Sequence, residues 1–539
     1  MKKIKLHKDY TINQREYQLK ISIELEYKIP ANDSVRLLSQ IIEEIDLTEL
    51  YQTYYRINEK KATPRQMLKI ILYAYMNEIY SSRGIEKACQ RDINFMYLLE
   101  GAKRPDHSTI ARFRQLHFAP YAKLIMARYS NKLFELGEIS GENIFIDGSK
   151  VEANASRYTF VWKRAVTKNL AKLLQKLADF VAKCELEYGI EIVYKNIVKM
   201  RHVKKLRKKL YTIKKQDNIT FVYGKGKRKN PLQRAIEQLE DYLKKLKDYT
   251  KKLFIAEKRN SYSKTDNDAT FMRMKEDHMR NGQLKPAYNI QHGVDAGYIT
   301  WLTVSQKPAD VHTLIPFLEE AESYLDFKYK NIIVDAGYES EENYMFIERN
   351  RQVAYLKPTN YEISKTRKYK KDIGRFENMS YDKDSDSYIC KNKKRLVVTG
   401  TRMVTNKSGY SSEKTQYTCE DCTNCHYKTG CIKGNNSKIP LSERTKRLEI
   451  AKLFHEKRQE SLARITSSFG CLLRVNRSIQ AEGSFANTKH NMKFRRFLSR
   501  GLKNVLAESI LLAIAHNTNK LHNKIQSGRT GMFLHQLIA

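Results

Sequence analysis

The chain has 539 residues, of which 41% are hydrophobic, and no apolar run approaches the roughly 20 residues that a membrane helix needs. A chain of this length is expected to form two or three compact units, and we expect a soluble protein with no membrane partner. Its 99 lysines and arginines against 60 acidic residues give a formal net charge of +39. Because such an excess repels itself until a polyanion binds, nucleic acid is the leading partner, either of an enzyme or of a packaging protein.

The first twenty residues are basic but lack the apolar segment and the small-residue cleavage site of a signal peptide. We therefore expect a cytoplasmic protein. In that compartment the eight cysteines are expected to be reduced thiols or metal ligands rather than a disulfide framework.

Residues 1–140 are predicted to form an all-α N-terminal domain that binds DNA, since apolar residues recur there at three- and four-residue steps. Thr63 and Pro64 supply an N-cap and a proline at the first helical position. Residues 82–117 predict two helices with a short glycine-containing connection. This pattern is typical of a helix-turn-helix DNA reader and equally of a helical bundle with a basic face.

The pattern changes at residue 143, where short apolar runs replace the helical steps. Written in chain order, the elements read β β β α β α β, which predicts an α/β fold with a mixed five-stranded sheet and flanking helices. The five predicted strands lie in NIFIDGSKVEA (143–153), AYNIQHGVDA (287–296), YITWLTVSQ (298–306), NIIVDAGYES (331–340) and VAYLKP (353–358).

Two long insertions interrupt this order. Residues 166–284 predict a basic helical insertion, in which residues 201–230 hold twelve lysines or arginines and one aspartate. A solvated helical face is the usual meaning of such a run, but this density favours contact with phosphate groups. Residues 376–440 are polar and turn-rich and hold five of the eight cysteines. After them the chain is helical again, and residues 521–539 are expected to be a tail whose last dozen residues are frayed.

Two aspartates stand at the ends of predicted strands. Asp147 closes the first strand and Asp335 closes the fourth. If these strands are neighbours, both carboxylates emerge where open α/β sheets place their sites, and they repel each other unless divalent cations such as Mg²⁺ or Mn²⁺ neutralise them. Taken singly, each aspartate is equally well explained as a turn residue. Asp295 and Asp310 are spare candidates that we interpret as a turn residue and a helix cap.

A late helix supplies a third carboxylate. Glu482 is followed seven residues later by Lys489, which lies two helical turns away and therefore on the same face of an α-helix. Two strand-end aspartates followed by a glutamate on a late helix resemble the RNase H-like fold of DDE nucleotidyl transferases.

The motifs together make the resemblance narrower. The chain resembles the cut-and-paste DDE transposases of bacterial insertion sequences, in the branch with a helical N-terminal DNA-binding domain and a cysteine-bearing insertion before the catalytic glutamate. The resembling motifs are DHSTIARFR, IFIDGSKVEANAS, YNIQHGVDA, VDAGYES and EGSFANTKHNMKFRRFLSRG. The resemblance implies an RNase H-like catalytic core built from residues 141–165, 285–375 and 441–520. It also implies that Asp147, Asp335 and Glu482 are the catalytic triad and bind two Mg²⁺ or Mn²⁺ ions.

The resemblance also implies contacts with double-stranded DNA, both transposon ends and target. Many relatives carry an arginine four residues before the glutamate, where this chain has Ser478, so we assign the phosphate contact to Arg477 instead. Trp162 follows two alternating aromatic residues, a pattern that fits base stacking but is more commonly a half-buried strand. The predicted DNA-binding residues are Lys489, Arg477, Arg495, Arg496, Arg112, Arg114 and Trp162.

The implied function is cleavage of transposon ends and joining of the freed 3′-hydroxyl group to target DNA by two-metal phosphoryl transfer. Acting on two ends requires a homodimer or a larger assembly, and the implied location is the bacterial cytoplasm, in association with the nucleoid. Two alternatives stay open. One is a nuclease or resolvase of the same fold without strand transfer, and the other is a catalytically inactive DNA-binding protein.

The cysteine-rich insertion predicts a structural zinc site. Cys419, Cys422, Cys425 and Cys431 are spaced so that their thiolates can converge on one tetrahedral ion, and Cys390 can replace one of them. A structural ion would stabilise a polar insertion that has little core of its own. The alternative is a set of reduced thiols or a site that has been lost.

Overall fold

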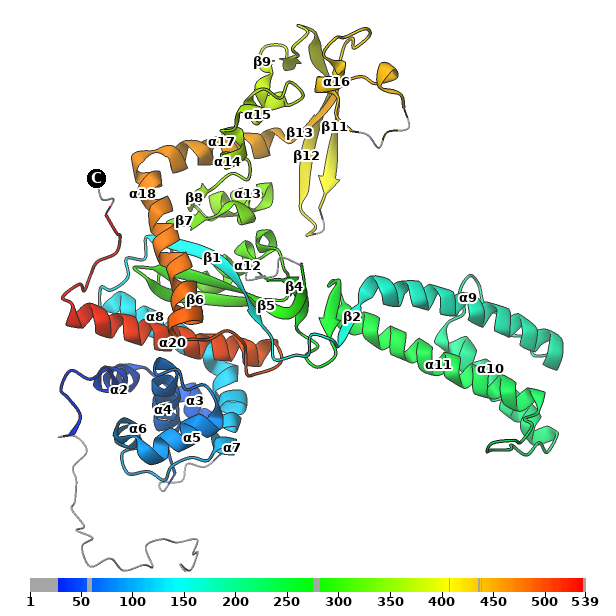
Figure 1. Cartoon of the computed structure of the whole chain (residues 1–539), viewed down its shortest axis with the longest axis horizontal. Coiled ribbons are helices and arrows are strands. Elements are labelled where there is room, and N and C mark those ends of the chain that lie inside the picture. Colours follow the sequence, from blue (N-terminus) through cyan, green and yellow to red (C-terminus); the bar gives the residue numbers. More distant parts are fainter. Residues whose placement is uncertain are drawn as a thin grey trace, which may run out of the picture.

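The computed structural model describes residues 28–55, 61–274, 282–406, 408–434, 437 and 439–536. A central mixed sheet with helices around it forms the body, a long helical arm projects from one side, and a smaller antiparallel sheet lies at another end (Figure 1). None of the helices within these ranges is long and apolar enough to cross a membrane.

The central sheet contains all five predicted strands. Neighbouring strands follow the order β6, β5, β1, β7, β8, in which β1 is antiparallel to β5 and parallel to β7. The first and fourth predicted strands, β1 and β7, are therefore neighbours, which is the condition under which their aspartates were expected to lie together. The strands are β1 (Asn143–Glu152), β5 (Leu284–Asp295), β6 (Tyr298–Ser305), β7 (Asn331–Val334) and β8 (Val353–Leu356).

Strand β1 continues beyond Asp147. Asp147 does not close it, because β1 keeps pairing with β5 as far as Glu152 after the shorter β7 has ended at Val334. The prediction of a strand end at Asp147 was wrong for this reason. The length of a strand depends on partners that are distant in the sequence.

Three short strands were missed in and beside the predicted helical insertion. β4 (Thr270–Arg273) adds a sixth strand to the central sheet by pairing with the start of β5. β2 (Phe160–Trp162) and β3 (Ser261–Ser263) pair with each other. Runs of three or four residues are too short to show the alternating pattern of a strand, so the sequence did not predict these strands. Residues 166–284 therefore contain less helix than predicted.

Helix α20 (Leu502–Gln526) lies between the N-terminal helices and the sheet. It contacts α4, α8 and β6, and all of these contribute to one continuous hydrophobic core. The predicted cap at Thr63 is present: its side chain accepts a hydrogen bond from the backbone N–H of Gln66. The side chain of Gln66 accepts one from the backbone N–H of Thr63, which completes a capping box. The N-terminal helices are α2 (Ser34–Glu44), α3 (Thr48–Gln52), α4 (Pro64–Met76), α5 (Ser82–Arg91), α6 (Ile93–Leu99), α7 (His107–Arg112) and α8 (Ala119–Glu135), with a π-helical turn at Phe113–Phe118.

The arm consists of three helices with a core of their own. α9 (Lys163–Tyr188), α10 (Met200–Gln216) and α11 (Pro231–Ala256) bury apolar side chains such as Leu177, Leu206 and Leu239 among themselves. The β2–β3 pair stands where the arm leaves the body (Figure 1).

The cysteine-rich segment folds as a second sheet, which the sequence did not predict. Its five antiparallel strands have the order β13, β12, β11, β10, β9, and β13 lies beyond the predicted end of the insertion at residue 440. Many side chains of β11 and β12 are exposed, so the alternation that signals a half-buried strand is weak. The strands are β9 (Ser380–Asp382), β10 (Ser387–Ile389), β11 (Arg395–Thr405), β12 (Ser411–Cys419) and β13 (Arg447–Ile450).

The remaining helices surround the central sheet or follow the second one. The helix that carries Glu482 is α18 (Ser468–Arg477), which continues through the π-helical turn η7 (Ser478–Glu482) into α19 (Gly483–Ala486) and a second π-helical turn, η8 (Asn487–Asn491). The others are α12 (Leu314–Tyr324), α13 (Glu341–Arg349), α14 (Tyr361–Ser364), α15 (Arg367–Lys370), α16 (Lys428–Cys431) and α17 (Lys452–Thr466).

The described part of the C-terminal tail is held in place, contrary to the expectation of a frayed end. Helix α20 continues to Gln526, and residues 531–535 then run against α18 and η7. The buried side chain of Asn476 binds both backbone groups of His535: Nδ2 donates to the carbonyl oxygen at 2.9 Å, and Oδ1 accepts from the N–H at 2.8 Å. We call residues 531–535 the C-terminal strap.

Candidate active site

The two predicted catalytic aspartates occupy equivalent positions on neighbouring parallel strands. Ile146 of β1 pairs with Val334 of β7, so Asp147 and Asp335 are the next residue of each strand in register. Asp147 lies within β1 and its residue is 6% exposed, whereas Asp335 follows the last residue of β7 in an extended conformation. The structure thus brings these two residues together.

Both aspartates are on the face of the sheet that α18 and η7 cover. Phe145 and Ile333, two residues before each aspartate, are buried in one cluster with Leu473 and Ala481 of that helix. Because side chains two residues apart in a strand share a face, the carboxylates are directed to the same side.

Glu482 stands at the end of η7 and joins the aspartates through Arg477. Glu482 Oε1 accepts a hydrogen bond from Arg477 Nη2 at 2.8 Å, and Arg477 Nη1 lies 3.9 Å from Asp147 Oδ1. Nη1 is buried and has no hydrogen-bond partner among the residues that the structure describes. The guanidinium group of Arg477 therefore lies between Asp147 and Glu482, and its Nη1 has no hydrogen-bond partner in the described structure.

The π-helical turn explains why the arginine that pairs with Glu482 stands five residues before it, rather than four as in many relatives. In an α-helix, residues five apart point about 140° away from each other. The i→i+5 bonding of a π turn brings residue i+5 back over residue i, so Arg477 reaches Glu482. Ser478, at the position where relatives carry arginine, also donates to Glu482 from its hydroxyl group, at 3.3 Å.

Lys489 lies against β1 close to the aspartates. Its Nζ donates to Ser149 Oγ at 2.8 Å and to the carbonyl oxygen of Lys150 at 3.2 Å. Ser149 is two residues beyond Asp147 and therefore on the same face of β1. The second π turn, η8, contains Lys489, so simple α-helical spacing from Glu482 does not describe its position.

Tyr338 lies among the carboxylates. Its hydroxyl group donates a hydrogen bond to Gln291 Oε1. Burial raises the pKa of Tyr338 well above its usual value, and the nearby carboxylates of Asp310, Asp147 and Asp335 raise it further. This tyrosine is thus a neutral donor at the base of the acidic cluster.

Asp310, one of the two spare candidates, belongs to this neighbourhood. Its Oδ1 accepts hydrogen bonds from Asn289 Nδ2 at 2.7 Å and Gln291 Nε2 at 3.0 Å. Helix α12 begins at Leu314 without a side-chain cap, so the predicted capping role of Asp310 for that helix was wrong. Gly148 is required here, because a Cβ atom would lie 2.6 Å from Asp310 Oδ1.

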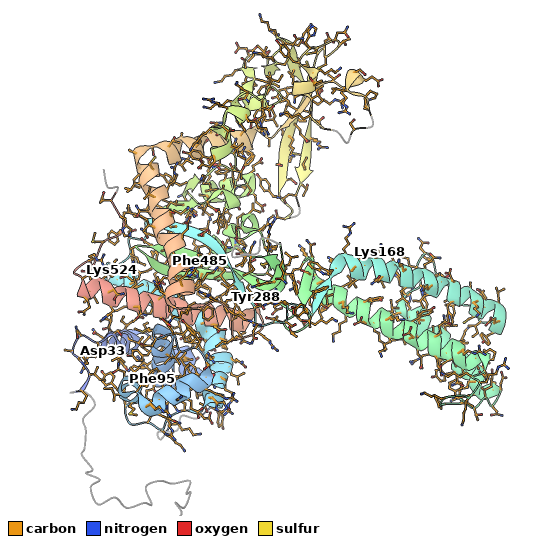
Figure 2. All side chains as sticks on the ribbon, in the orientation of Figure 1. Asp33, Phe95, Lys168, Tyr288, Phe485 and Lys524 are labelled. Atoms are coloured by element: carbon orange, nitrogen blue, oxygen red, sulfur yellow. The ribbon has the colours of Figure 1, made fainter. Side chains whose placement is uncertain are left out.

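His292 is a residue whose role the sequence did not reveal. It pairs with Asp147 across β5 and β1, and its Nδ1 lies 3.0 Å from Ser484 Oγ. Its ring stacks on that of Phe485, with centroids 4.0 Å apart, and Phe485 lies within the body of the molecule in Figure 2. Burial, followed by nearby His516 and Lys489, lowers the pKa of His292 to about 3. It is therefore a neutral support beneath α19.

The other spare candidate, Asp295, is a buried structural residue. It ends β5 before a turn, as predicted, and its Oδ2 accepts from the backbone N–H groups of Ser140 and Gly141, each at 2.9 Å. Burial raises the pKa of this carboxyl group to about 6. Asp295 thereby holds the loop that leads into β1.

The remaining predicted DNA-binding residues occupy different settings. Arg112 and Arg495 are exposed. Arg114 donates to the carbonyl oxygen of Tyr80 at 2.9 Å and to Ser82 Oγ at 2.5 Å, so it braces helices of the N-terminal region.

Arg496 and Trp162 also have internal contacts. Arg496 donates to the carbonyl oxygens of Ala153 and Ala155, each at 3.1 Å. Trp162 lies in β2, where a half-buried strand was the favoured interpretation, with ring centroids 6.0 Å from both Phe160 and Phe271. Whether any of the predicted residues contacts DNA stays a prediction.

The five cysteines of the insertion line one small cavity at the end of the second sheet. Cys390 directly follows β10, and Cys419 ends β12. Burial and the neighbouring thiol of Cys422 raise the pKa of Cys419 to about 12. The cysteines that line the cavity are Cys390, Cys419, Cys422, Cys425 and Cys431.

Both clusters have donors that suit a metal ion. In the described ranges, no group of three or more His, Cys, Asp and Glu side chains is already gathered as metal ligands are. The donor chemistry nevertheless fits: carboxylates around a cationic guanidinium suit a hard divalent ion, and a cavity lined by thiols suits zinc.

The fold and the acidic cluster define an α/β protein with a carboxylate site at the end of its sheet. Two family models match the chain: "Transposase DDE domain" over residues 389–522, and "Transposase domain (DUF772)" over residues 23–116. These matches support a DDE transposase of insertion-sequence type. The first match includes Glu482, while Asp147 and Asp335 lie outside both. No curated protein and no solved structure is significantly similar to the chain.

The family carries general properties. DDE transposases are metal-dependent enzymes that cleave DNA, and they generally use divalent ions such as Mg²⁺. The prediction of a transposase is therefore confirmed at this level.

Proposed function

We propose that this protein cleaves DNA at the ends of an insertion sequence and joins the freed 3′-hydroxyl group to target DNA. Asp147, Asp335 and Glu482 are the proposed metal-binding triad. The observation that carries the proposal is the shared register and shared face of the two aspartates, opposite the helix that ends in Glu482. The strand order and the late helix support an RNase H-like core.

Each proposed residue has a role that follows from its contacts. Asp147 is mounted within a paired strand, so its position is rigid. Arg477 offsets the repulsion between Asp147 and Glu482, and its unused Nη1 donor suits a phosphate oxygen. Divalent ions bound by the triad would activate the attacking water or 3′-hydroxyl group and stabilise the leaving oxygen.

The proposal extends to the partners of the reaction. The N-terminal helices, matched by the second transposase model, are the proposed reader of the transposon end. Acting on two ends requires at least a homodimer on DNA. The proposed location is the bacterial cytoplasm, with the nucleoid DNA as target.

The test is a reaction of the purified full-length protein with the DNA that flanks its gene, in the presence of Mg²⁺. Mapping of broken and joined strands should reveal both products, and Asp335→Asn should abolish them while duplex binding persists. Nicks without joined product would identify a nuclease or resolvase instead. Cleavage that survives Asp335→Asn would overturn the assignment, and tight binding without any cleavage would identify an inactive DNA-binding protein.

We also propose that the cysteine cavity holds one structural Zn²⁺ ion. The ion would join the ends of β10 and β12 to the loop around α16, in a sheet whose own core is small. Metal analysis of the purified protein should give one zinc per chain, which Cys419→Ser and Cys422→Ser should remove. Cys89→Ser, at a buried cysteine of the N-terminal region, is the matched control and should retain the ion. Protein without zinc, or with zinc unaffected by both changes, would contradict the site.

A further inference from the structure

The arm is long enough to reach well beyond the active site. Helices α9 and α11 each have 26 residues and lie side by side, so the arm extends for about 39 Å at 1.5 Å per residue. It leaves the body next to β4, an edge strand of the central sheet, and α10 packs along α11 (Figure 1). The arm therefore carries α10 outward from the body that contains the carboxylates.

The three arm helices differ in charge. Helix α9 has six basic and three acidic residues, a balance of +3, and α11 has six basic and four acidic residues, a balance of +2. Helix α10 has eight basic residues and none that is acidic, a balance of +8. Ion pairs within one helix reflect this difference, with Lys183–Glu187 in α9 and Lys245–Asp241 and Lys252–Asp248 in α11.

The charges of α10 face solvent. Val203, Leu206 and Leu210 are completely buried and pack into the core of the arm. Across the described residues, no lysine or arginine of α10 forms an ion pair with a carboxylate. The exposed basic residues of α10 are Arg201, Lys204, Lys205, Arg207, Lys208 and Lys215, and Lys225, Lys227 and Arg228 extend the set in the following loop.

We propose that this exposed face of α10, the basic face, binds the phosphate backbone of the duplex whose end lies at the carboxylate site. Unpaired like charges on one helix repel one another, and a polyanion removes that cost by releasing its own counterions. An arm of about 39 Å spans about one helical turn of DNA, which is about 34–36 Å. The basic face would then meet the same side of the duplex about one turn from the cleavage position.

This inference rests on the proposed function, because it names a second contact on the same substrate. It differs from the proposed function in what it requires, because DNA binding needs neither a metal ion nor a cleavage reaction. A protein that binds through α10 but never cleaves would retain this inference and lose the proposed function.

The test compares two full-length variants of equal charge change. One replaces Lys204, Lys205, Arg207, Lys208 and Lys215 of the basic face with glutamine. The other, a matched control, replaces Lys183, Lys244, Lys245, Lys251 and Lys252 of α9 and α11 with glutamine. Binding to a labelled duplex from the DNA that flanks the gene is measured with EDTA present, over a series of salt concentrations, together with a footprint.

The basic-face variant should bind more weakly and with a less steep salt dependence. Loss of five phosphate contacts reduces the slope of log K against log salt by about 4.5. The footprint should retreat by about one helical turn on the side of the arm, while the control keeps the slope and the footprint of the unaltered protein. Replacing the four lysines of the basic face with arginine should preserve binding, which excludes misfolding as the cause.

Three results would overturn the proposal. One is an unchanged slope and footprint in the basic-face variant, and another is an equal loss in the control, which would indicate a general effect of charge. The third is displacement of the duplex from the basic face by single-stranded DNA or RNA at lower concentration than by unlabelled duplex, which would assign the face to another nucleic acid.

Discussion

Basic side chains serve opposite purposes at the carboxylate site and on the arm. Arg477 is 17% exposed and is paired with Glu482, and Lys489 donates to β1. The basic residues of α10 instead face solvent, and in the described structure none of them pairs with a carboxylate. The first set organises the protein's own acids and backbone, while the second is available to a polyanion. Residue type alone therefore does not distinguish a residue of the site from a residue of a binding surface.

The two regions also differ in how they are stabilised. The sheet, the N-terminal helices and α20 share one core, whereas the three arm helices bury their apolar side chains in a separate cluster. Changes in the arm should therefore stay local, and changes in the body should not. The following predictions test that separation, starting from the largest effect.

Truncation of the arm's core should unfold the arm alone. Leu206→Ala is expected to destabilise the arm by about 3 kcal/mol, because it removes a completely buried side chain from a small cluster. Hydrogen exchange should accelerate in α9, α10 and α11 and stay unchanged in β1. Leu511→Ala, in the shared core, is the control and should accelerate exchange in the N-terminal helices and the sheet together. Loss of protection in β1 after Leu206→Ala would contradict separate cores.

Loss of the bridging arginine should reduce catalysis without weakening binding. Arg477→Gln is expected to lower the cleavage rate at saturating Mg²⁺ by about 100-fold, because it removes the group that holds Glu482 and that we propose contacts the phosphate. Duplex affinity should change less than about threefold, the reverse of the pattern for the basic face of α10. Arg477→Lys, which keeps the charge but not the fork, should recover part of the rate. Equal losses of cleavage rate and duplex affinity would mean that catalysis and DNA binding are not divided between the carboxylate site and the arm.

Removal of the Asn476 side chain, which holds the C-terminal strap, should destabilise the body moderately. Asn476→Ala leaves the backbone N–H and carbonyl groups of His535 without their partner, at a cost of about 2 kcal/mol. Thermal unfolding of the body should shift downward while the arm is unaffected. Asn523→Ala, at an exposed asparagine of α20, is the control and should have little effect. An unchanged midpoint in the Asn476 variant would show that the strap contributes nothing to stability.

Acid should destabilise the body through His516. Burial lowers the pKa of His516 to about 4, and the neutral ring accepts from Asn487 Nδ2 at 2.7 Å while its Nε2 lies 3.2 Å from the carbonyl oxygen of Gly297. Between pH 6.5 and about 4 the unfolded chain binds the proton that the folded chain excludes. The contribution is therefore present above pH 6.5 and decreases as pH falls, by about 1.4 kcal/mol per pH unit.

The measurement for His516 is chemical denaturation at a series of pH values. His516→Gln should show a smaller decrease in unfolding free energy than the unaltered protein over this window. Parallel curves for the two proteins would exclude His516 as the titrating group.

Sequence reasoning identified the strands of the sheet more securely than the arrangement of the site. The apolar run that ends in Val334 gives a strong signal because β7 is buried, and the run that ends in Leu356 is also apolar although β8 is buried only at alternate residues. The extent of β1 beyond Asp147 depends on pairing with β5, and β4 is too short to display a period. The second sheet was missed in part because its longest strand, β11, exposes side chains on both faces.

The neighbours of the triad were harder to foresee. The π turn adds a residue to one helical turn without a characteristic sequence, so the pairing of Arg477 with Glu482 could not be derived from spacing. Asp310 and His292 join the cluster through the sheet's tertiary arrangement. Asp310 was named only as a spare candidate, and His292 lies in YNIQHGVDA, where no role was assigned to it. The hydrogen bonds between Asn476 and the strap connect residues 59 positions apart, which no local pattern reveals.

The hydrogen bonds of Asn476 and Gln480 with the C-terminal strap are made to its main chain rather than to its side chains. Asn476 and Gln480, which flank Arg477 and precede Glu482, bind backbone groups of His535 and Phe533. Most replacements at positions 533 and 535 should therefore preserve these hydrogen bonds, because the bonds do not require a particular side chain there. Proline at position 535 is the exception, because it has no N–H to donate to Asn476. The two amides, which stand beside Glu482, thus constrain the backbone path of the strap rather than the side chains at these two positions.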